Sequence, residues 1–253
     1  MHYRAMLTKQ RKLLLLEQLR KHGRIVANEM SQRFGLSEDT IRRDLRELAS
    51  EGKLQRVHGG ALPASPTIAN LAARRGMATD EKVKLGMAGA KLITNGITAF
   101  IDGGTTNLEL VRQLPIDVSA TIFTHSPSIA VALEVHQNIK VILIGGSLFK
   151  HSMVTMGVVA IEAIRRMRVD IFFLGVTGLH PTEGLTTGDY DEAQIKCLIA
   201  SRSAETITMV TSEKIGAASA FAIIPISSLT TLIVDKKSKL PRFQKDGLSI
   251  IQV

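Results

Sequence analysis

The chain has 253 residues, 45% of them hydrophobic, so it is long enough for two domains and too apolar for a disordered protein. Its single cysteine, Cys197, excludes a disulfide framework and a cysteine-rich metal cluster. No apolar run reaches the roughly 20 residues that a membrane-spanning helix needs. Residues 1–10 also lack the apolar core of a signal peptide. We therefore expect a cytoplasmic protein with no membrane partner.

The net charge of +9 is concentrated near the N-terminus. Residues 1–75 contain 15 Lys and Arg against 7 Asp and Glu, whereas residues 76–253 contain 17 against 16. A basic excess can serve solubility alone. An excess confined to one segment is also what neutralisation of nucleic-acid phosphates requires, so the motifs of that segment must decide.

Two helices are predicted first. One covers residues 8–21, is capped by Thr8, and turns three leucines inward: Leu15, Leu16 and Leu19. A shorter helix is expected over residues 25–34, with Val26, Met30 and Phe34 on one face.

A third helix begins after the glycine turn at Gly35 and ends near Gly52. Ser37 is its N-cap, because a serine hydroxyl can accept a hydrogen bond from a free amide in the first turn. Ile41, Leu45 and Leu48 mark its buried stripe, and the outward face carries Ser37, Thr40, Arg42, Arg43 and Arg46. This arrangement predicts a helix-turn-helix whose last helix enters the major groove of DNA.

Residues 53–61 predict a β-hairpin wing after that helix. Leu54 and Val57 alternate with polar residues, and two glycines follow. Arg56 and His58 would lie along the DNA backbone or in the minor groove. Pro63, Ser65 and Pro66 then break regular structure, so we place the winged helix-turn-helix domain at 1–62 and a linker at 63–78.

Residues 79–253 change to strands that alternate with helices. This order predicts a Rossmann-like open α/β domain with a parallel sheet. Strands are expected at 99–102, 120–123, 140–144, 169–174, 206–211 and 231–234, and helices at 80–93, 106–113, 127–136, 158–168 and 192–202.

A glycine-rich turn joins the first of these strands to a helix. Its residues are Asp102, Gly103, Gly104, Thr105 and Thr106. Glycines let the backbone approach an anion, and the free amides and threonine hydroxyls at a helix start can hold a phosphate. Many α/β folds use such a turn only to reverse the chain, so the motif alone is weak.

A second polar cluster covers residues 186–196. Asp189 precedes a helix and can cap it, while Glu192 and Lys196 are four residues apart. That spacing is also the spacing of an ordinary surface ion pair, so the residues themselves leave a binding role open.

The chain resembles the DeoR family of bacterial transcriptional regulators over essentially its whole length, with the motifs in the family's order. The residues that carry this resemblance are Arg11, Leu15, Leu19, Ser37, Thr40 to Leu45, Arg56 to Ala61, Asp102 to Thr106, Gly145, Gly146, Phe173 to Leu179, Gly184 to Thr187, Asp189, Glu192, Ala193 and Lys196.

The resemblance implies a winged-helix domain joined to a sensor and oligomerisation domain similar in fold to ribose-5-phosphate isomerase. It implies a repressor of a carbohydrate catabolic operon that binds operator DNA as a homo-oligomer, a dimer or tetramer, at the bacterial nucleoid. The expected effector, the small molecule that controls DNA binding, is a phosphorylated sugar or related metabolite. Its expected site comprises the 102–106 turn with His125, Asp189, Glu192, Lys196 and Lys214.

Two positions depart from the family pattern. His125 stands where the family usually has Asn, and Thr211 stands where it usually has Asp. Either change can alter the choice of ligand, so no specific sugar is carried over. A metal role for His125 would need further ligands at suitable spacing, and we expect neither a metal nor a cofactor.

Two other functions stay open at this stage. A sugar-phosphate isomerase carrying a DNA-binding domain would need a carboxylate base and a stabilised enediolate, and Asp189, Glu192 and Lys196 could fill those roles. A structural DNA-binding protein would leave the glycine-threonine turn without a purpose. We favour the regulator and expect no catalytic residues.

Substitution of Arg42 or Arg43 with Ala is expected to abolish operator binding while the sensor domain stays folded. An arginine can hold guanine through two hydrogen bonds, which contribute about 1–3 kcal/mol of discrimination. Operator affinity measured at matched salt checks this, and affinity unchanged in both variants would contradict the assignment.

Overall fold

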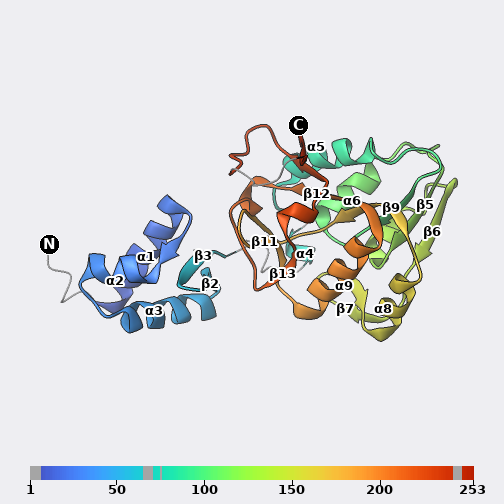
Figure 1. Ribbon diagram of the computed structural model, residues 1–253. Helices are drawn as coiled ribbons and strands as arrows, with labels where there is room; N and C mark the ends of the chain where they lie inside the picture. The colour runs from blue at the N-terminus through green and yellow to red at the C-terminus, as the bar shows by residue number, and fades with distance from the viewer. Residues whose placement is uncertain (1–6, 65–70, 75, 242–246) are drawn as a thin grey trace.

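The computed structural model describes residues 7–64, 71–74, 76–241 and 247–253. A small helical part with a wing precedes a larger part built on a seven-stranded sheet (Figure 1). This confirms the predicted fold class, a winged helix-turn-helix followed by an open α/β domain. No helix in the described ranges is long and apolar enough to cross a membrane. Ser65 and Pro66, expected to mark the linker, lie outside these ranges.

Three helices and a three-stranded antiparallel sheet form the N-terminal part. The helices are α1 (Thr8–His22), α2 (Ala27–Phe34) and α3 (Glu38–Ser50), and the strands are β1 (Ile25–Val26), β2 (Leu54–Val57) and β3 (Gly60–Pro63). The strand order is β1-β3-β2, so the hairpin is the predicted wing. The core of this N-terminal part contains the side chains that the apolar spacing predicted to be buried, Leu15, Ile41, Leu45 and Leu48.

Local predictions fail at three points in this part. The N-cap of α1 is Leu7 rather than Thr8, and it makes no side-chain cap. Ile25 and Val26 form β1 instead of starting a helix, because they pair with β3. A Cβ at Gly60 would lie 1.8 Å from the Ile25 carbonyl oxygen, so this pairing needs glycine. Pro63 ends β3 and does not break it.

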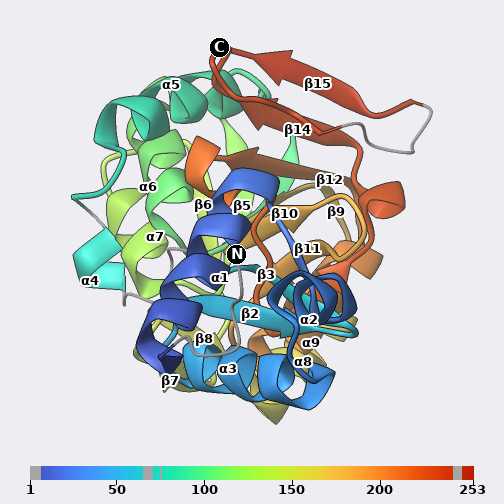
Figure 2. The same cartoon turned by 90° about the vertical axis from the view of Figure 1, so that its left-hand side faces the viewer.

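A parallel seven-stranded sheet forms the core of the larger part. Its order is β15-β14-β12-β9-β4-β5-β6 (Figure 2). Six of these strands fall where the sequence predicted them, within a few residues, and β15 adds an unpredicted edge. The strands are β4 (Thr98–Ile101), β5 (Ala120–Thr124), β6 (Ile139–Leu143), β9 (Val169–Leu174), β12 (Ser203–Val210), β14 (Thr231–Val234) and β15 (Ser249–Gln252).

Helices cover both faces of this sheet. One face carries α5 (Thr79–Ala90), α6 (Thr105–Arg112) and α7 (Pro127–Ala132), and the other carries α8 (Val158–Arg165) and α9 (Tyr190–Ser201). Alternate residues of each strand face the two cores, because the side-chain period of a strand is two. In β9, Phe173 packs under α5 and α6, while Phe172 and Leu174 pack against α8 and α9.

Smaller elements surround the carboxyl ends of the central strands. They are α4 (Leu71–Arg74), the hairpin of β7 (Ser147–Phe149) and β8 (Val154–Met156), the sheet of β10 (Gly178–His180), β11 (Gly184–Thr187) and β13 (Phe221–Ile224), and the 3-10 helix η3 (Ser212–Lys214). In open α/β sheets, ligands bind at this end of the strands. These elements therefore shape any site there. A second 3-10 helix, η4 (Ile226–Ser228), instead precedes the start of β14.

Candidate functional site

The glycine-rich turn joins the end of β4 to the start of α6. Gly104 takes the N-cap position with φ of 126°, and no side chain caps the helix. The Thr106 hydroxyl is buried and has no hydrogen-bond partner among the described residues. Because the positive end of a helix dipole and free amides attract anions, this turn is suited to bind a phosphate-sized anion.

Asp102 lies beneath this turn and is fully buried. Its carboxylate accepts hydrogen bonds from the amides of Gly103 (2.7 Å) and Gly175 (2.9 Å) and is 2.7 Å from Nε2 of His125. A Cβ at Gly175 would lie 2.6 Å from the Gly103 carbonyl oxygen, so only glycine permits this close approach. Asp102 thus fixes two loops of the site to each other.

Lys196 completes a buried charge network. Its ammonium lies 3.2 Å from Asp102 and 3.1 Å from Glu192, and it donates to the Gly175 carbonyl at 2.7 Å. Burial would lower the pKa of Lys196, but the two carboxylates outweigh this and raise it. Burial would likewise raise the pKa values of Asp102 and Glu192, but Lys196 is the largest of the effects that bring both below normal.

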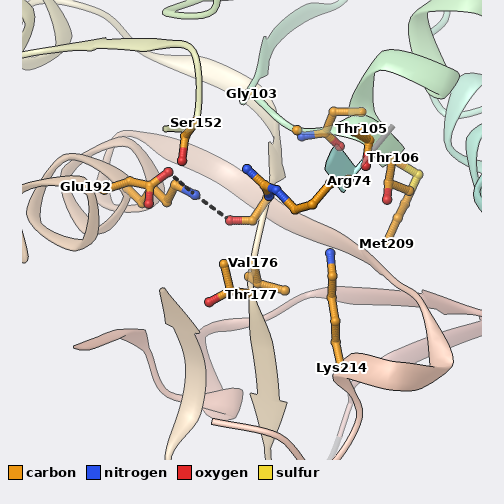
Figure 3. A pocket seen from close by; sticks show the side chains of 14 residues that line it. Arg74, Gly103, Thr105, Thr106, Ser152, Val176, Thr177, Glu192, Met209 and Lys214 are labelled. Atoms are coloured by element: carbon orange, nitrogen blue, oxygen red, sulfur yellow. Dashed lines mark hydrogen bonds and ion pairs between the residues drawn. The ribbon is translucent and has the colours of Figure 1, made fainter. Parts of the chain in front are cut away.

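Two further cations line the pocket at this turn, and neither forms an ion pair within the described part of the chain. Arg74, from α4, is 8% exposed, and its Nε has no hydrogen-bond partner. Lys214, at the end of η3, is 7% exposed, and burial lowers its pKa to about 7, with Arg74 adding to the effect. Burial also lowers the pKa of Arg74. Figure 3 shows the Lys214 side chain extending toward Arg74 and Thr106, while the guanidinium of Arg74 points across the pocket toward the side of Glu192 and Ser152.

The groups around the turn line a small pocket of about 30 Å³. A larger cavity of about 230 Å³ adjoins it and shares Ser152, Thr177 and Glu192 with it. The first is cationic through Arg74 and Lys214, whereas hydroxyl and carboxylate groups line the second, among them Thr187 and Asp189. The arrangement suits a molecule with an anionic end and a hydroxylated end.

Most of the predicted effector-binding residues lie in or beneath these two cavities. Gly103, Gly104, Thr105, Thr106, Glu192, Lys196 and Lys214 line the first pocket. Asp102 and His125 lie buried beneath it, and the ring of His125 is also held by the Thr155 carbonyl at 3.1 Å. Asp189 lines the adjoining cavity and caps α9 by accepting from the Glu192 amide at 2.9 Å.

Glu192 and Lys196 have the spacing of a surface ion pair, but their pair is buried. Both side chains are about 95% buried, and the Glu192 carboxylate also accepts from the Thr187 hydroxyl at 2.6 Å. Sequence reasoning missed Arg74, which it assigned to the linker. It also missed Ser152 and Thr177, which come from irregular loops. In the sequence, Arg74 stands out only as the first of two adjacent arginines that follow the apolar residues Leu71, Ala72 and Ala73.

The predicted DNA-reading face is exposed. Ser37 caps α3 by accepting from the Thr40 amide at 3.2 Å, as predicted. Arg42, Arg43 and Arg46 project from the same helix, and Arg42 pairs with Glu38 at 2.6 Å. Arg56 and His58 are exposed on the wing. Their contacts with DNA stay a prediction.

Asp44 is an acidic residue of the reading helix, where an outward-facing carboxylate would repel DNA phosphates. It is instead 1% exposed and forms a two-pronged ion pair with Arg11 of α1, one prong being 2.9 Å long. This pair holds the inner face of α3 against α1 and leaves Arg42 and Arg43 available.

Comparison with known proteins identifies both parts. Residues 11–67 match the DeoR-like helix-turn-helix domain, and residues 77–236 match the DeoR C terminal sensor domain. The transcriptional regulator GlpR of Haloferax volcanii is 31% identical over 240 residues, covering 91% of each chain. The glycerol-3-phosphate regulon repressor of Escherichia coli is 32% identical over 203 residues, covering 80% of this chain and 81% of its own.

A solved structure gives a weaker likeness. Ribose 5-phosphate isomerase A of Methanocaldococcus jannaschii is 16% identical over 53% of each chain, with a TM-score of 0.40, and nothing further rests on it. The two family matches together span most of the chain, in the order that the sequence motifs predicted. The chain therefore belongs to the DeoR family of transcriptional regulators.

Proposed function

We propose that this regulator represses a carbohydrate catabolic operon and that a phosphorylated sugar or related metabolite controls its operator binding. One observation carries the chemistry of the effector: Arg74 and Lys214 are buried in the pocket beside an uncapped helix start, and neither is paired with a carboxylate among the described residues. Buried cations are costly unless they are paired, so a phosphate group on the ligand would offset that cost. The hydroxylated part of the ligand would face Thr187, Asp189 and Glu192.

The curated relatives support this chemistry. One is named as a repressor of a glycerol-3-phosphate regulon, and glycerol 3-phosphate is a small phosphate ester with free hydroxyl groups. The pocket here has the same two requirements, an anionic end and a hydroxylated end. The identity of the sugar is left to experiment, because His125 and Thr211 depart from the family pattern.

The proposed DNA-binding residues are Ser37, Thr40, Arg42, Arg43, Arg46, Arg56 and His58. Thr40 and one of the two central arginines would reach base edges, and the wing residues would contact the DNA backbone or minor groove.

We also propose a homo-oligomer, a dimer or tetramer, acting in the bacterial cytoplasm. Paired half-sites in an operator require paired reading helices. Sedimentation of the purified protein would measure the assembly.

We propose sensing without turnover in place of the isomerase alternative. A general base for isomerisation works best with a pKa near the operating pH. Glu192 has a lowered pKa, and its carboxylate is already engaged by Lys196 and Thr187. Asp189 is engaged as the cap of α9. Incubation with ribose 5-phosphate should yield no ketose by NMR, and enzyme-dependent ketose would favour the isomerase.

A thermal-shift screen tests the effector class. The purified full chain is heated with phosphorylated sugars and glycerol 3-phosphate, each beside its unphosphorylated counterpart. A true effector at about 100 times its Kd should stabilise the protein by about 2.7 kcal/mol, and its counterpart should not. The same compound should then change affinity for operator DNA selected from random duplexes. The proposal fails if no phosphorylated compound does both.

A further inference from the structure

Arg74 reaches the pocket from the segment that connects the wing to the sensor domain. The wing ends at Pro63, whose carbonyl accepts from the Ala218 amide at 3.4 Å. The described chain resumes as α4, and the Leu71 amide donates to the His151 carbonyl at 2.9 Å. The last residue of α4 is Arg74, so a pocket-lining cation lies eleven residues after the wing.

Lys82 fixes the backbone around Arg74 through hydrogen bonds. It is a lysine of α5 that is only 3% exposed, and its ammonium donates to the Arg74 carbonyl at 2.7 Å and to the Met77 carbonyl. Burial lowers the pKa of Lys82, so its position is costly and needs these acceptors. The backbone of Arg74 is therefore anchored to α5, while the Nε of its guanidinium has no hydrogen-bond partner among the described residues.

Arg74 lies near a second cation, and the carboxylates close to it are already paired with Lys196. Lys214 faces Arg74 across the pocket, and the charges of Lys214 and Arg74 repel each other. The nearest carboxylates, Glu192 and Asp102, are already paired with Lys196. A guanidinium can bind phosphate oxygens through two parallel hydrogen bonds, which a lysine cannot do.

We propose that Arg74 is an anion clamp supplied by the connecting segment, so that the phosphate of the effector fixes that segment and, through it, the position of the DNA-binding domain. In the empty protein Lys214 repels the guanidinium. With a dianion between them, both cations and the start of α6 are neutralised together, and α4 is held against the sensor domain. This inference rests on the proposed phosphate-bearing effector and adds the route by which binding reaches the DNA-binding part.

The test uses the full chain with inorganic phosphate as the probe. Thermal shift gives the apparent Kd for wild type, Arg74→Gln, Arg74→Lys and a control, Arg165→Gln, whose arginine is exposed and forms a surface pair with Glu162. Arg74→Gln should weaken phosphate binding by about tenfold or more, Arg74→Lys by less, and Arg165→Gln by under about twofold. Circular dichroism melts verify folding, and Arg74→Lys keeps the test valid if Arg74→Gln is unstable.

Hydrogen exchange measures whether phosphate binding orders the segment that carries Arg74. Phosphate should slow exchange at the amides of Leu71–Arg74 and 76–78 in wild type and in Arg165→Gln, but not in Arg74→Gln. Phosphate binding by Arg74→Gln within about twofold of wild type would overturn the clamp and leave the phosphate-sensing function intact. Unchanged exchange in phosphate-bound wild type would overturn the coupling. Failure of wild type to bind phosphate or any phosphate ester would overturn the proposed function itself.

Discussion

Replacement of Asp102 with Asn is expected to lower the free energy of unfolding by about 3–5 kcal/mol, because it removes one partner from a buried charge network. Asp102 is fully buried between His125 and Lys196 and accepts two backbone amides. The neutral amide of asparagine cannot accept at both oxygen positions. Lys196 would then have Glu192 as its only carboxylate partner.

Urea unfolding of the full chain, followed on the sensor-domain transition, measures this loss. Asp117→Asn is the matched control, since Asp117 is exposed and its side chain has no partner among the described residues. It should change stability by less than about 0.5 kcal/mol. A loss for Asp102→Asn no larger than that of the control would show that the network does not hold the site together.

The network also predicts the acid sensitivity of the fold. The pKa of Asp102 in the folded protein lies below its ordinary value of 3.8. Between these two values the unfolded chain binds more protons, so the contribution of Asp102 is present above pH 3.8 and lost as pH falls toward the folded pKa. The Asp102→Asn variant should therefore show a shallower loss of stability in this acid range.

Replacement of Lys214 with Met should have two opposite effects. It should stabilise the empty protein by on the order of 2 kcal/mol, because a buried cation without an anionic partner is removed. It should also weaken inorganic phosphate binding by about tenfold or more, because one of the two free cations is lost. Thermal melts with and without phosphate measure both. A variant that is less stable yet binds phosphate normally would contradict the role assigned to Lys214.

The titration of Lys214 gives this prediction a pH dependence. Its pKa in the empty pocket is about 7, set by burial and then by Arg74, Glu213, Lys82 and Lys196. A bound dianion would raise that pKa, so binding above pH 7 takes up a proton. Affinity for sulfate, which stays dianionic, should fall by up to about tenfold per pH unit above pH 7. Lys214→Arg should bind sulfate with little change over the same range.

The same titration affects stability with a defined sign. The folded pKa of about 7 lies below the ordinary value of 10.5, so between these values the unfolded chain binds more protons. The contribution of Lys214 to the stability of the empty protein therefore rises as pH increases from about 7 to 10.5. In Lys214→Met this rise should be absent.

The sequence predicted the fold well wherever one periodic signal dominated. The largely apolar run at 169–174 was predicted as a strand, and it is β9. The start of α3 was equally well defined, because Ser37 supplies a local cap. Ile25 and Val26 were assigned to a helix because Val26, Met30 and Phe34 recur at helical spacing. Their pairing with β3 depends on a glycine thirty-five residues away in Gly60, which no local pattern contains.

The site was predictable where a motif marked it and not where tertiary packing made it. Gly103 to Thr106 favoured an anion-binding turn by their composition together with the family resemblance. Lys214 came only from the family resemblance, and Arg74 was missed because its function depends on α4 folding back over the sheet end. The Asp102–His125 contact joins residues from two different strand ends, so only the parallel sheet order brings them together.

The two faces of α3 have separate roles, so the residues that would read the operator can be changed without changing the fold. Its inner face, with Ile41, Leu45 and Asp44 paired to Arg11, holds the helix in place. Its outer face carries Thr40, Arg42, Arg43 and Arg46, whose side chains support no other element of the described chain. A library randomised at these four positions should therefore yield mostly folded proteins, and selecting from it would give regulators that read new operators under the same metabolite.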